Sequence, residues 1–233
     1  MQNNLPLMST YSYLPLNLVK GEGSYLFDDK GNKYIDFTSG IGVNSLGYGN
    51  SNWIKAITDT LSNLQHISNI FLNENTLKLA EELTKKSKMS KVFFCNSGAE
   101  ANEGAIKLAR KYSFDKYGLN RNKILTLNQS FHGRTLAALT ATGQDKFHNY
   151  YFPFPEGFDY FEANNTKDFK DKLSNHVCAV MLEAIQGEGG VNPLSKDFVK
   201  EVYETCREKD ILLIFDEVQC GIGRTGMMFG YEY

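Results

Sequence analysis

The feature that most constrains the fold is an apolar run that stops abruptly at two acids. Residues Ile211–Phe215 are all apolar, and Asp216 and Glu217 follow them directly. Such a run, without polar alternation, is typical of a strand buried on both faces of a sheet. In open α/β sheets, ligands bind outside the carboxyl ends of the strands. Asp216 is therefore a candidate site residue, and the glycine-rich residues 221–226 after it are expected to form a loop.

Strand and helix patterns alternate from Lys91 onward. The expected strands are Val92–Cys95, Ile124–Leu127, Val177–Leu182 and Ile211–Phe215, and the expected helices are Gly98–Tyr117, Arg134–Thr142 and Lys196–Lys209. This succession predicts an α/β fold with a mostly parallel sheet and helices on both faces. The spacing within the long helix predicts a packed face of Ala101, Ala105, Leu108 and Tyr112. Phe147–Asn165 is interpreted as an aromatic, proline-containing connection.

The part of the chain before Lys91 carries turn signals and two helical patterns. In order, we expect a loose arm over residues 1–20, a hairpin of Ser24–Phe27 and Lys33–Thr38, a loop over Thr38–Asn52, and helices over Ser51–Gln65 and Asn73–Lys86. We therefore divide the chain into an amino-terminal arm and hairpin segment, residues 1–50, and a larger domain, residues 51–233.

The composition is that of an ordinary globular protein. Apolar residues make up 42% and charged residues 22% of the chain, which argues against disordered and membrane classes. The net charge of −2 gives no electrostatic case for a nucleic acid or a membrane surface as partner. No apolar run approaches the roughly 20 residues of a membrane span, and no basic leader precedes Lys20. The four cysteines are expected to be free thiols in the cytoplasm.

The predicted helix at Gly98 begins with a pattern suited to anions. Ser97 and Glu100 form a capping-box pattern. The first turn of a helix offers free N–H groups and a positive dipole end, which favours an anion by about 0.3–1 kcal/mol, or roughly 2 kcal/mol when partly buried. Gly98 would let a phosphate approach the backbone closely. A capped helix without a ligand remains the alternative on this stretch alone.

Two further strand ends carry groups that could bind a ligand. Residues Ser130–Arg134 supply an aromatic ring, a histidine and an arginine, which could stack on a flat ligand and pair with a carboxylate. A turn with a buried phenylalanine and a surface arginine is the alternative. Glu183 follows the strand Val177–Leu182, and the loop Gln186–Gly190 comes next. A single glutamate there is commonly a structural acceptor, but three strand ends of this kind together indicate a site.

An apolar strand that ends in Asp-Glu also occurs in P-loop NTPases, where it binds magnesium. Those proteins require GxxxxGK[ST] earlier in the chain, and no glycine here is followed by Lys-Ser or Lys-Thr. The glycines around Gly187 do not fit a dinucleotide fingerprint, and HExxH, GxSxG and zinc-type spacings are missing. We expect no metal site.

Four motifs, in this order, resemble those of the class III aminotransferases, which are pyridoxal-phosphate enzymes of fold type I. The motifs are Asn96–Glu103, Phe131–Thr135, Leu182–Gly190 and Asp216–Gln219. The resemblance extends over the chain from about Thr10 onward and implies the large domain of that fold. Within the family, Gly40–Tyr48 and Gln219–Arg224 are most similar to the acetylornithine aminotransferase branch.

The resemblance implies pyridoxal 5′-phosphate as the cofactor and assigns residues to it. They are Ser97, Gly98 and Ala99 at the phosphate, Phe131 and Val218 on the two faces of the ring with His132 beside them, Asp216 at the pyridine nitrogen, and Gln219 at the ring hydroxyl. For the substrate, it implies that Arg134 holds the α-carboxylate, Glu188 acts as a gate, and Glu183 supports the site.

The activity implied is transfer of the terminal amino group of N2-acetylornithine to 2-oxoglutarate, within arginine biosynthesis. It would proceed as two half-reactions with ping-pong kinetics, in a homodimer that takes small amino-acid and 2-oxo-acid substrates. Ornithine, succinylornithine and 4-aminobutyrate aminotransferases share the motifs and remain alternatives. A non-catalytic remnant that binds the cofactor is the alternative from another class.

One departure concerns the Schiff-base lysine, which the family places downstream of the Asp216–Gln219 motif. None of the lysines before Tyr233 lies in that context. We therefore expect this chain to be the amino-terminal portion of an aminotransferase, incomplete at the carboxyl end and inactive by itself. Ala184 also stands where the family usually has proline.

Overall fold

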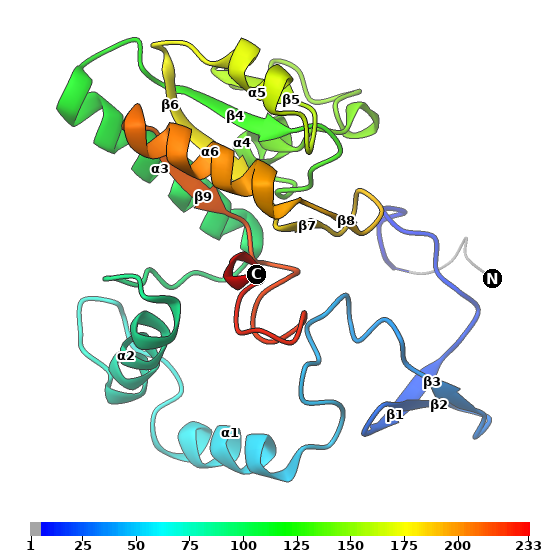
Figure 1. The fold of residues 1–233 in the computed structure, drawn as a ribbon. Coiled ribbons are helices and arrows are strands. Elements are labelled where there is room, and N and C mark those ends of the chain that lie inside the picture. The colour runs from blue at the N-terminus through cyan, green and yellow to red at the C-terminus, as the bar shows by residue number, and fades with distance from the viewer. Residues whose placement is uncertain (1–5) are drawn as a thin grey trace. The chain divides into compact units, whose positions relative to one another are not determined.

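The structure is a computed structural model that describes residues 6–233 (Figure 1). The chain forms two compact units, which meet in sequence between Asn73 and Glu74. The first unit contains β1 (Leu18–Glu22), β2 (Tyr25–Asp28), β3 (Lys33–Ile35) and α1 (Ser51–Asn63). The second contains α2 (Glu74–Ser87), α3 (Gly98–Tyr117), β4 (Lys123–Leu127), α4 (Leu136–Ala141), η2 (Asp145–Phe147), β5 (Phe158–Phe161), α5 (Thr166–Lys172), β6 (Val177–Leu182), β7 (Ile185–Gln186), β8 (Asn192–Pro193), α6 (Lys196–Glu208), β9 (Leu212–Phe215) and η3 (Gly230–Glu232). The domain boundary expected after residue 50 stays a prediction.

The first unit is built on an antiparallel sheet in the order β1-β2-β3. The predicted hairpin corresponds to β2 and β3, in which Leu26 pairs with Tyr34. The expectation of a loose arm up to residue 20 is wrong where Leu18–Glu22 pairs with β2. The first five residues of that arm lie outside the described residues. After the glycine-rich loop, the Asn50 side chain accepts a hydrogen bond from Trp53 N and caps α1.

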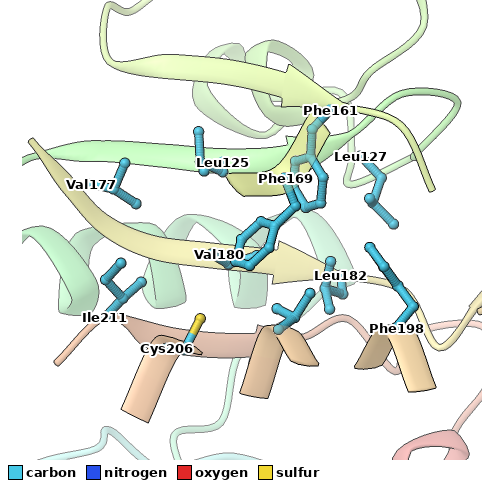
Figure 2. Packing of buried hydrophobic residues seen from close by; sticks show 11 residues of the cluster. Leu125, Leu127, Phe161, Phe169, Val177, Val180, Leu182, Phe198, Cys206 and Ile211 are labelled. Atoms are coloured by element: carbon cyan, nitrogen blue, oxygen red, sulfur yellow. The ribbon is translucent and has the colours of Figure 1, made fainter. Parts of the chain in front are cut away.

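The second unit contains the predicted parallel sheet, with strands in the order β5-β4-β6-β9. Its two faces are packed by separate apolar clusters. One contains Ile106 and Ala109 of α3 and Ala141 of α4 against β4 and β6. The other, drawn in Figure 2, contains residues of β4, β5, β6, α5 and α6 together with Ile211, which precedes β9: Leu125, Leu127, Phe161, Phe169, Val177, Val180, Leu182, Phe198, Val202, Cys206 and Ile211. β6 is buried along its whole length, so the sheet is a central layer between helices.

The prediction of a strand at Val92–Cys95 is wrong. The segment has no strand partner among residues 6–233, and the Phe93 side chain is 73% exposed. A strand requires a neighbour for its backbone hydrogen bonds, so an apolar run alone does not form one. The opposite error concerns the predicted connection Phe147–Asn165, because Phe158–Phe161 within it pairs with β4 as β5.

The predicted packed face of α3 is also wrong, by one residue along the helix. The buried residues are Asn102, Ile106, Ala109 and Ser113, whereas Leu108 of the predicted face is 69% exposed. A shift of one residue rotates a helix face by about 100°. The small alanines of α3 could face either way, and the packing of Ile106 and Ala109 on β4 and β6 decides the orientation. Among residues 6–233, no helix has both the length and the apolar content that crossing a membrane requires.

Candidate functional site

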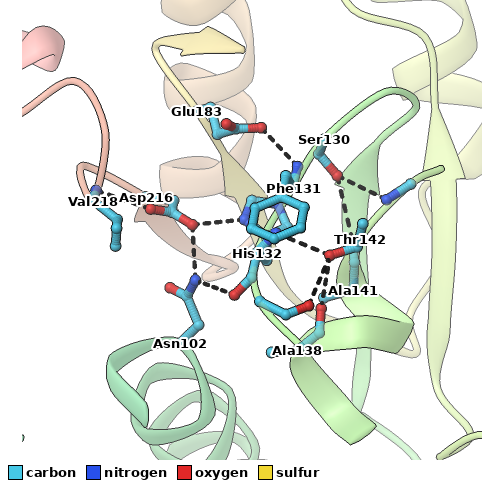
Figure 3. A network of polar contacts seen from close by, with 12 residues as sticks. Asn102, Ser130, Phe131, His132, Ala138, Ala141, Thr142, Glu183, Asp216 and Val218 are labelled. Atoms are coloured by element: carbon cyan, nitrogen blue, oxygen red, sulfur yellow. Dashed lines mark hydrogen bonds and ion pairs between the residues drawn. The ribbon is translucent and has the colours of Figure 1, made fainter. Parts of the chain in front are cut away.

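The candidate site lies where β4, β6 and β9 end side by side. Leu182 pairs with Phe215 in the parallel ladder, and Asp216 N donates to Leu182 O at 2.7 Å. Glu183 and Asp216 therefore leave the sheet as neighbours. The loop after β4 brings Phe131 and His132 to the same edge (Figure 3). The sequence motifs that follow these three strands thus meet in space.

Three neighbouring residues contact the Asp216 carboxylate in this cluster. Its Oδ2 accepts from Asn102 Nδ2 at 2.7 Å and lies 2.8 Å from His132 Nδ1, and its Oδ1 accepts from Val218 N at 3.0 Å. Burial alone would raise the pKa of this carboxyl, but the donors from His132, Val218 and Asn102 outweigh it and lower the pKa below its usual value. Asp216 is therefore a buried carboxylate that stays ionised.

His132 is held on three sides. Its backbone N donates to Thr142 Oγ1 at 2.9 Å, its backbone O accepts from Asn102 Nδ2 at 2.7 Å, and its ring Nδ1 faces Asp216. The ring Nε2 is buried and has no hydrogen-bond partner within residues 6–233. A ring with its proton on Nδ1 donates to the carboxylate and leaves only an acceptor unpaired, which costs less than burying an unpaired N–H.

Glu183 contacts the loop after β4 from the neighbouring strand end. Its Oε2 accepts a hydrogen bond from Phe131 N at 3.0 Å, and the residue is 5% exposed. Burial is the main reason why the pKa of Glu183 rises to about 7. Glu183 and Asp216 are thus adjacent acids whose pKa values move in opposite directions.

The start of α3 offers unpaired backbone donors. Ser97 Oγ accepts from Glu100 N at 3.2 Å, and Glu100 Oε2 accepts from Asn96 N at 2.6 Å. The predicted capping box is therefore only half present: Ser97 caps the helix, but Glu100 accepts from Asn96 N and not from Ser97 N. Within residues 6–233, the backbone N–H groups of Gly98 and Ala99 have no hydrogen-bond acceptor. Both residues are half-buried, so the positive end of the helix faces the site edge with two free donors.

Close packing joins this helix start to the other two loops. A Cβ atom on Gly98 would lie 2.7 Å from Val218 Cγ2, and one on Gly133 would lie 2.8 Å from Ala99 Cβ. Real Cβ atoms do not approach so closely, so a side chain at Gly98 would displace Val218, and one at Gly133 would collide with the first turn of α3. The first turn of α3, the segment after β9 and the loop after β4 are therefore in direct contact.

The remaining predicted residues lie around the edge of this cluster. The Phe131 ring packs against Phe147, with ring centroids 5.7 Å apart, and the Arg134 guanidinium lies 5.8 Å from the Phe131 ring. Gln219 lies against Gly187, where a Cβ atom would be 1.7 Å from Gln219 Oε1. Glu188 is exposed in the turn between β7 and β8.

Two residues of α3 that organise the site were not predicted. Asn102 bonds Asp216 and His132, as described above. Glu103 Oε1 accepts from Thr135 Oγ1 at 2.6 Å and from the backbone N of Ala137 and Ala138 at 3.2 Å, so it caps α4 from outside. Both lie within the motif Asn96–Glu103, so their place in it was the only available signal.

Residues Gly221, Gly223 and Gly226 also have the GxGxxG spacing of a dinucleotide-binding loop. That fingerprint requires a strand followed at once by a helix that starts at the glycines. Residues 221–226 instead form successive turns and do not open a helix. The three glycines therefore do not form a dinucleotide-binding loop, although their spacing matches one.

Known proteins resemble this chain in sequence and in fold. Residues 8–233 match the family described as Aminotransferase class-III. The chain belongs to the class-III aminotransferase family. It is 52% identical to the acetylornithine aminotransferase of Haemophilus ducreyi over 227 residues, which are 97% of this chain and 58% of that protein. The chain thus spans little more than half of that relative's length.

Two solved structures show the same fold. The ornithine aminotransferase of Toxoplasma gondii, crystallised with oxidised glutathione and with partial occupancy of PLP at its active site, matches with a TM-score of 0.92 and 30% identity. The match covers 97% of this chain and 54% of that chain. The N-acetylornithine aminotransferase of Stenotrophomonas maltophilia matches with a TM-score of 0.81 and 38% identity, covering 94% and 55%. The fold is therefore that of the fold-type-I aminotransferases, of which the chain spans about half.

The residues present fit the cofactor that the family implies. The two free amides at the start of α3 suit a phosphate. The buried, ionised Asp216 suits a protonated ring nitrogen. The absence of a Cβ at Gly98 lets the Val218 side chain pack directly on the helix start, beside the two free amides. The chemistry of this donor set therefore matches a phosphorylated pyridine.

Proposed function

We propose that the protein is a pyridoxal-phosphate-dependent aminotransferase that moves the terminal amino group of N2-acetylornithine to 2-oxoglutarate. The proposal concerns the whole protein, because the chain spans 58% of the length of its Haemophilus ducreyi relative. We place it in arginine biosynthesis and in the cytoplasm, acting as a homodimer. The observation that carries the proposal is the buried Asp216 carboxylate, which lies beside a helix start with two free amides.

The residues divide the work as follows. The Gly98 and Ala99 amides bind the phosphate, and Phe131 packs against the ring with Val218 on the other side. Asp216 holds a proton at the pyridine nitrogen, since a carboxylate beside that nitrogen favours its protonated form. When bound, the cofactor supplies an electron sink for bonds broken at the amino-bearing carbon. Gln219 contacts the ring hydroxyl.

The substrate residues lie at the edge of the same cluster. Arg134 is exposed beside the Phe131 ring, where its planar guanidinium can pair with a carboxylate through two parallel hydrogen bonds. We assign it to the α-carboxylate of the amino acid. Glu188, exposed in the turn after β7, is assigned to the gate for the second substrate. Glu183 supports the Phe131 backbone.

The substrate is tested by assaying the purified protein, in its full natural length, with N2-acetylornithine, ornithine and 4-aminobutyrate. Each donor is paired with 2-oxoglutarate, and glutamate formation is measured. We expect the highest kcat/KM with N2-acetylornithine. A preference for 4-aminobutyrate, or no transfer with any donor, overturns the proposal.

Ornithine aminotransferase is the second candidate. The ornithine aminotransferase of Toxoplasma gondii superposes with a higher TM-score than the N-acetylornithine enzyme of Stenotrophomonas maltophilia, although it is less similar in sequence. A higher kcat/KM with ornithine in the same assay would favour this candidate.

We also propose that residues 1–233 alone do not transfer amino groups. None of their lysines lies in the family's Schiff-base context. Assaying a polypeptide that stops at Tyr233 beside the protein of full natural length checks this. Glutamate formation by the short polypeptide would contradict it.

A further inference from the structure

Asn102 is a buried polar residue in the second turn of α3, and the roles proposed above leave it unassigned. It is 5% exposed and lies on the face of α3 that packs on the sheet, among Ile106, Ala109 and Ser113. A buried amide is unfavourable unless its donors are satisfied. The partners of this amide are His132 O and Asp216 Oδ2, each at 2.7 Å from Nδ2. One NH2 group therefore binds two different loops.

The hydrogen bond from Asn102 determines which oxygen of the Asp216 carboxylate keeps an unused acceptor position. An ionised carboxylate has about four acceptor positions, two on each oxygen. Asn102 and His132 occupy both positions on Oδ2, and Val218 N occupies one on Oδ1. Counting the donors within residues 6–233, one acceptor position remains, and it is on Oδ1. A fourth donor has to be received there.

We propose that Asn102 is a positioning residue that orients Asp216 for the ring nitrogen of the cofactor. By donating to Oδ2 it fixes the rotation of the carboxylate, and Oδ1 keeps one acceptor position for a pyridinium N–H. By donating to His132 O as well, it fixes the loop that carries Phe131. This inference rests on the proposed function, and it gives the long helix a second task besides phosphate binding.

The alternative is that Asn102 only stabilises the fold. The two roles predict different effects of an Asn102 substitution on ligands with and without the ring nitrogen. A structural role affects every ligand of the site alike. A positioning role affects ligands that carry the nitrogen and spares those that lack it. The comparison therefore requires two ligands that differ at one atom.

The test measures binding of pyridoxamine 5′-phosphate and of its 1-deaza analogue, in which CH replaces the ring nitrogen. Neither ligand can form a Schiff base with a lysine. Their binding therefore depends only on the non-covalent contacts proposed above for the cofactor. Dissociation constants are measured by calorimetry on apoprotein of full natural length. For the natural sequence we expect tighter binding of the ligand with the nitrogen. For Asn102→Leu we expect about 10- to 100-fold weaker binding of that ligand, because a donor to a charged group is lost, and little change for the deaza analogue.

Two further variants keep the result decisive. Asn102→Ala removes the same donor without placing a larger apolar side chain between the two loops, so it should abolish the preference for the nitrogen even if Asn102→Leu does not fold. Gln144→Leu is the matched control. Gln144 is a buried amide whose Nε2 donates to Ser130 O at 2.9 Å and does not touch Asp216. Its removal should leave the preference unchanged.

The outcomes separate this inference from the proposed function. If the natural sequence binds neither ligand, the proposed function fails. If it prefers the ligand with the nitrogen and the Asn102 variants keep that preference, only the inference fails. Equal loss of affinity for both ligands in the Asn102 variants also overturns it, because that result identifies a structural role.

Discussion

Asp216 and His132 are 84 positions apart in the chain, yet Asp216 Oδ2 lies 2.8 Å from His132 Nδ1. Their side chains are 4% and 0% exposed. The contact joins the end of β9 to the loop after β4, with β6 between these two strands in the sheet. The ionised form of Asp216 therefore depends on a residue that a separate loop holds in place.

Replacing His132 by leucine should weaken the fold in a way that depends on pH. The lowered pKa of Asp216 means that its ionised form stabilises the folded state above pH ~3.9, the value of an unfolded aspartate, and that this stability is lost as pH falls through the lowered pKa. Without the His132 donor, we expect about 1.5–3 kcal/mol less stability at neutral pH. We also expect the unfolding free energy of this variant to fall less steeply as the pH is lowered into the acid range. Denaturant unfolding between about pH 3 and pH 8 measures both.

An Asp216→Asn background provides the control for that experiment. Once Asp216 cannot ionise, His132→Leu should no longer change the acid part of the stability curve. If the double variant still shows the same flattening as the single variant, then another carboxyl is responsible and the explanation is wrong.

Glu183→Gln should stabilise the protein at high pH and change little at low pH. The pKa of Glu183 rises from 4.5 to about 7 in the folded chain. A raised carboxyl pKa favours the folded state below pH 4.5, and that contribution is lost as pH rises through about 7. A shift of this size corresponds to about 3 kcal/mol. Glutamine keeps an oxygen for Phe131 N, so the unfolding free energy at about pH 8 should rise by a similar order.

Glu208→Gln is a matched substitution at an exposed glutamate at the end of α6. It removes one carboxylate at an exposed position and so provides the comparison for the loss of the buried one. If Glu183→Gln changes the difference in stability between low and high pH no more than Glu208→Gln does, the burial of Glu183 does not control its ionisation.

The parts of the fold that could be predicted depend on short-range signals. β6 and β9 are runs of apolar residues, and α3 begins at Gly98 because Ser97 caps it. Each of these signals lies within a few residues of the element it specifies. The same holds for Asp216, whose position directly after an apolar strand marked it as a site residue. The prediction that this strand is buried on both faces is wrong, because β9 is half-buried and is the last strand of the sheet within residues 6–233.

The parts that could not be predicted depend on partners that are distant in the sequence. Val92–Cys95 has the composition of a strand but lacks a neighbour within residues 6–233. The packed face of α3 depends on β4 and β6, and a polar Asn102 on that face contradicts an apolar pattern. Asp216 and Glu217 are adjacent acids, yet Glu217 accepts from the backbone N of Gly230 and Tyr231 and takes no part in the cluster.

Gly98→Ala should weaken cofactor binding without unfolding the protein. The new Cβ would lie 2.7 Å from Val218 Cγ2, so Val218 has to move from the helix start. We expect roughly 10-fold weaker binding of pyridoxamine 5′-phosphate, equivalent to about 1.4 kcal/mol. Calorimetry measures the dissociation constant, and thermal unfolding shows whether the fold persists.

Gly104→Ala is the companion substitution in the same helix. Its Cβ would lie 3.3 Å from the edge of the exposed Phe93 ring, which can move. Because alanine is favoured over glycine within a helix by about 1 kcal/mol, we expect equal or greater stability and unchanged binding. If both alanine variants bind pyridoxamine 5′-phosphate equally well, then Gly98 is not part of the cofactor site.

Arg121→Ala should destabilise the fold and leave the site intact. Arg121 lies at the amino ends of the strands, opposite the site, and donates to Val177 O at 3.0 Å, Lys209 O at 2.7 Å and Asp210 O at 2.9 Å. Its guanidinium also lies 4.0 Å from the centre of the Tyr117 ring. Removing it leaves three carbonyl groups without this donor, for a loss of about 2 kcal/mol in the unfolding free energy.

Arg121→Lys distinguishes charge from geometry at this position. Lysine keeps the charge but cannot place planar donors on three carbonyl groups while stacking on a ring. We therefore expect it to recover less than half of the stability lost in Arg121→Ala, as measured by denaturant unfolding. The affinity for pyridoxamine 5′-phosphate should match the natural protein in both variants, because the contacts lie at the other end of the sheet. Full recovery by lysine would mean that Arg121 acts through its charge, and weaker binding would mean that the two ends of the sheet are coupled.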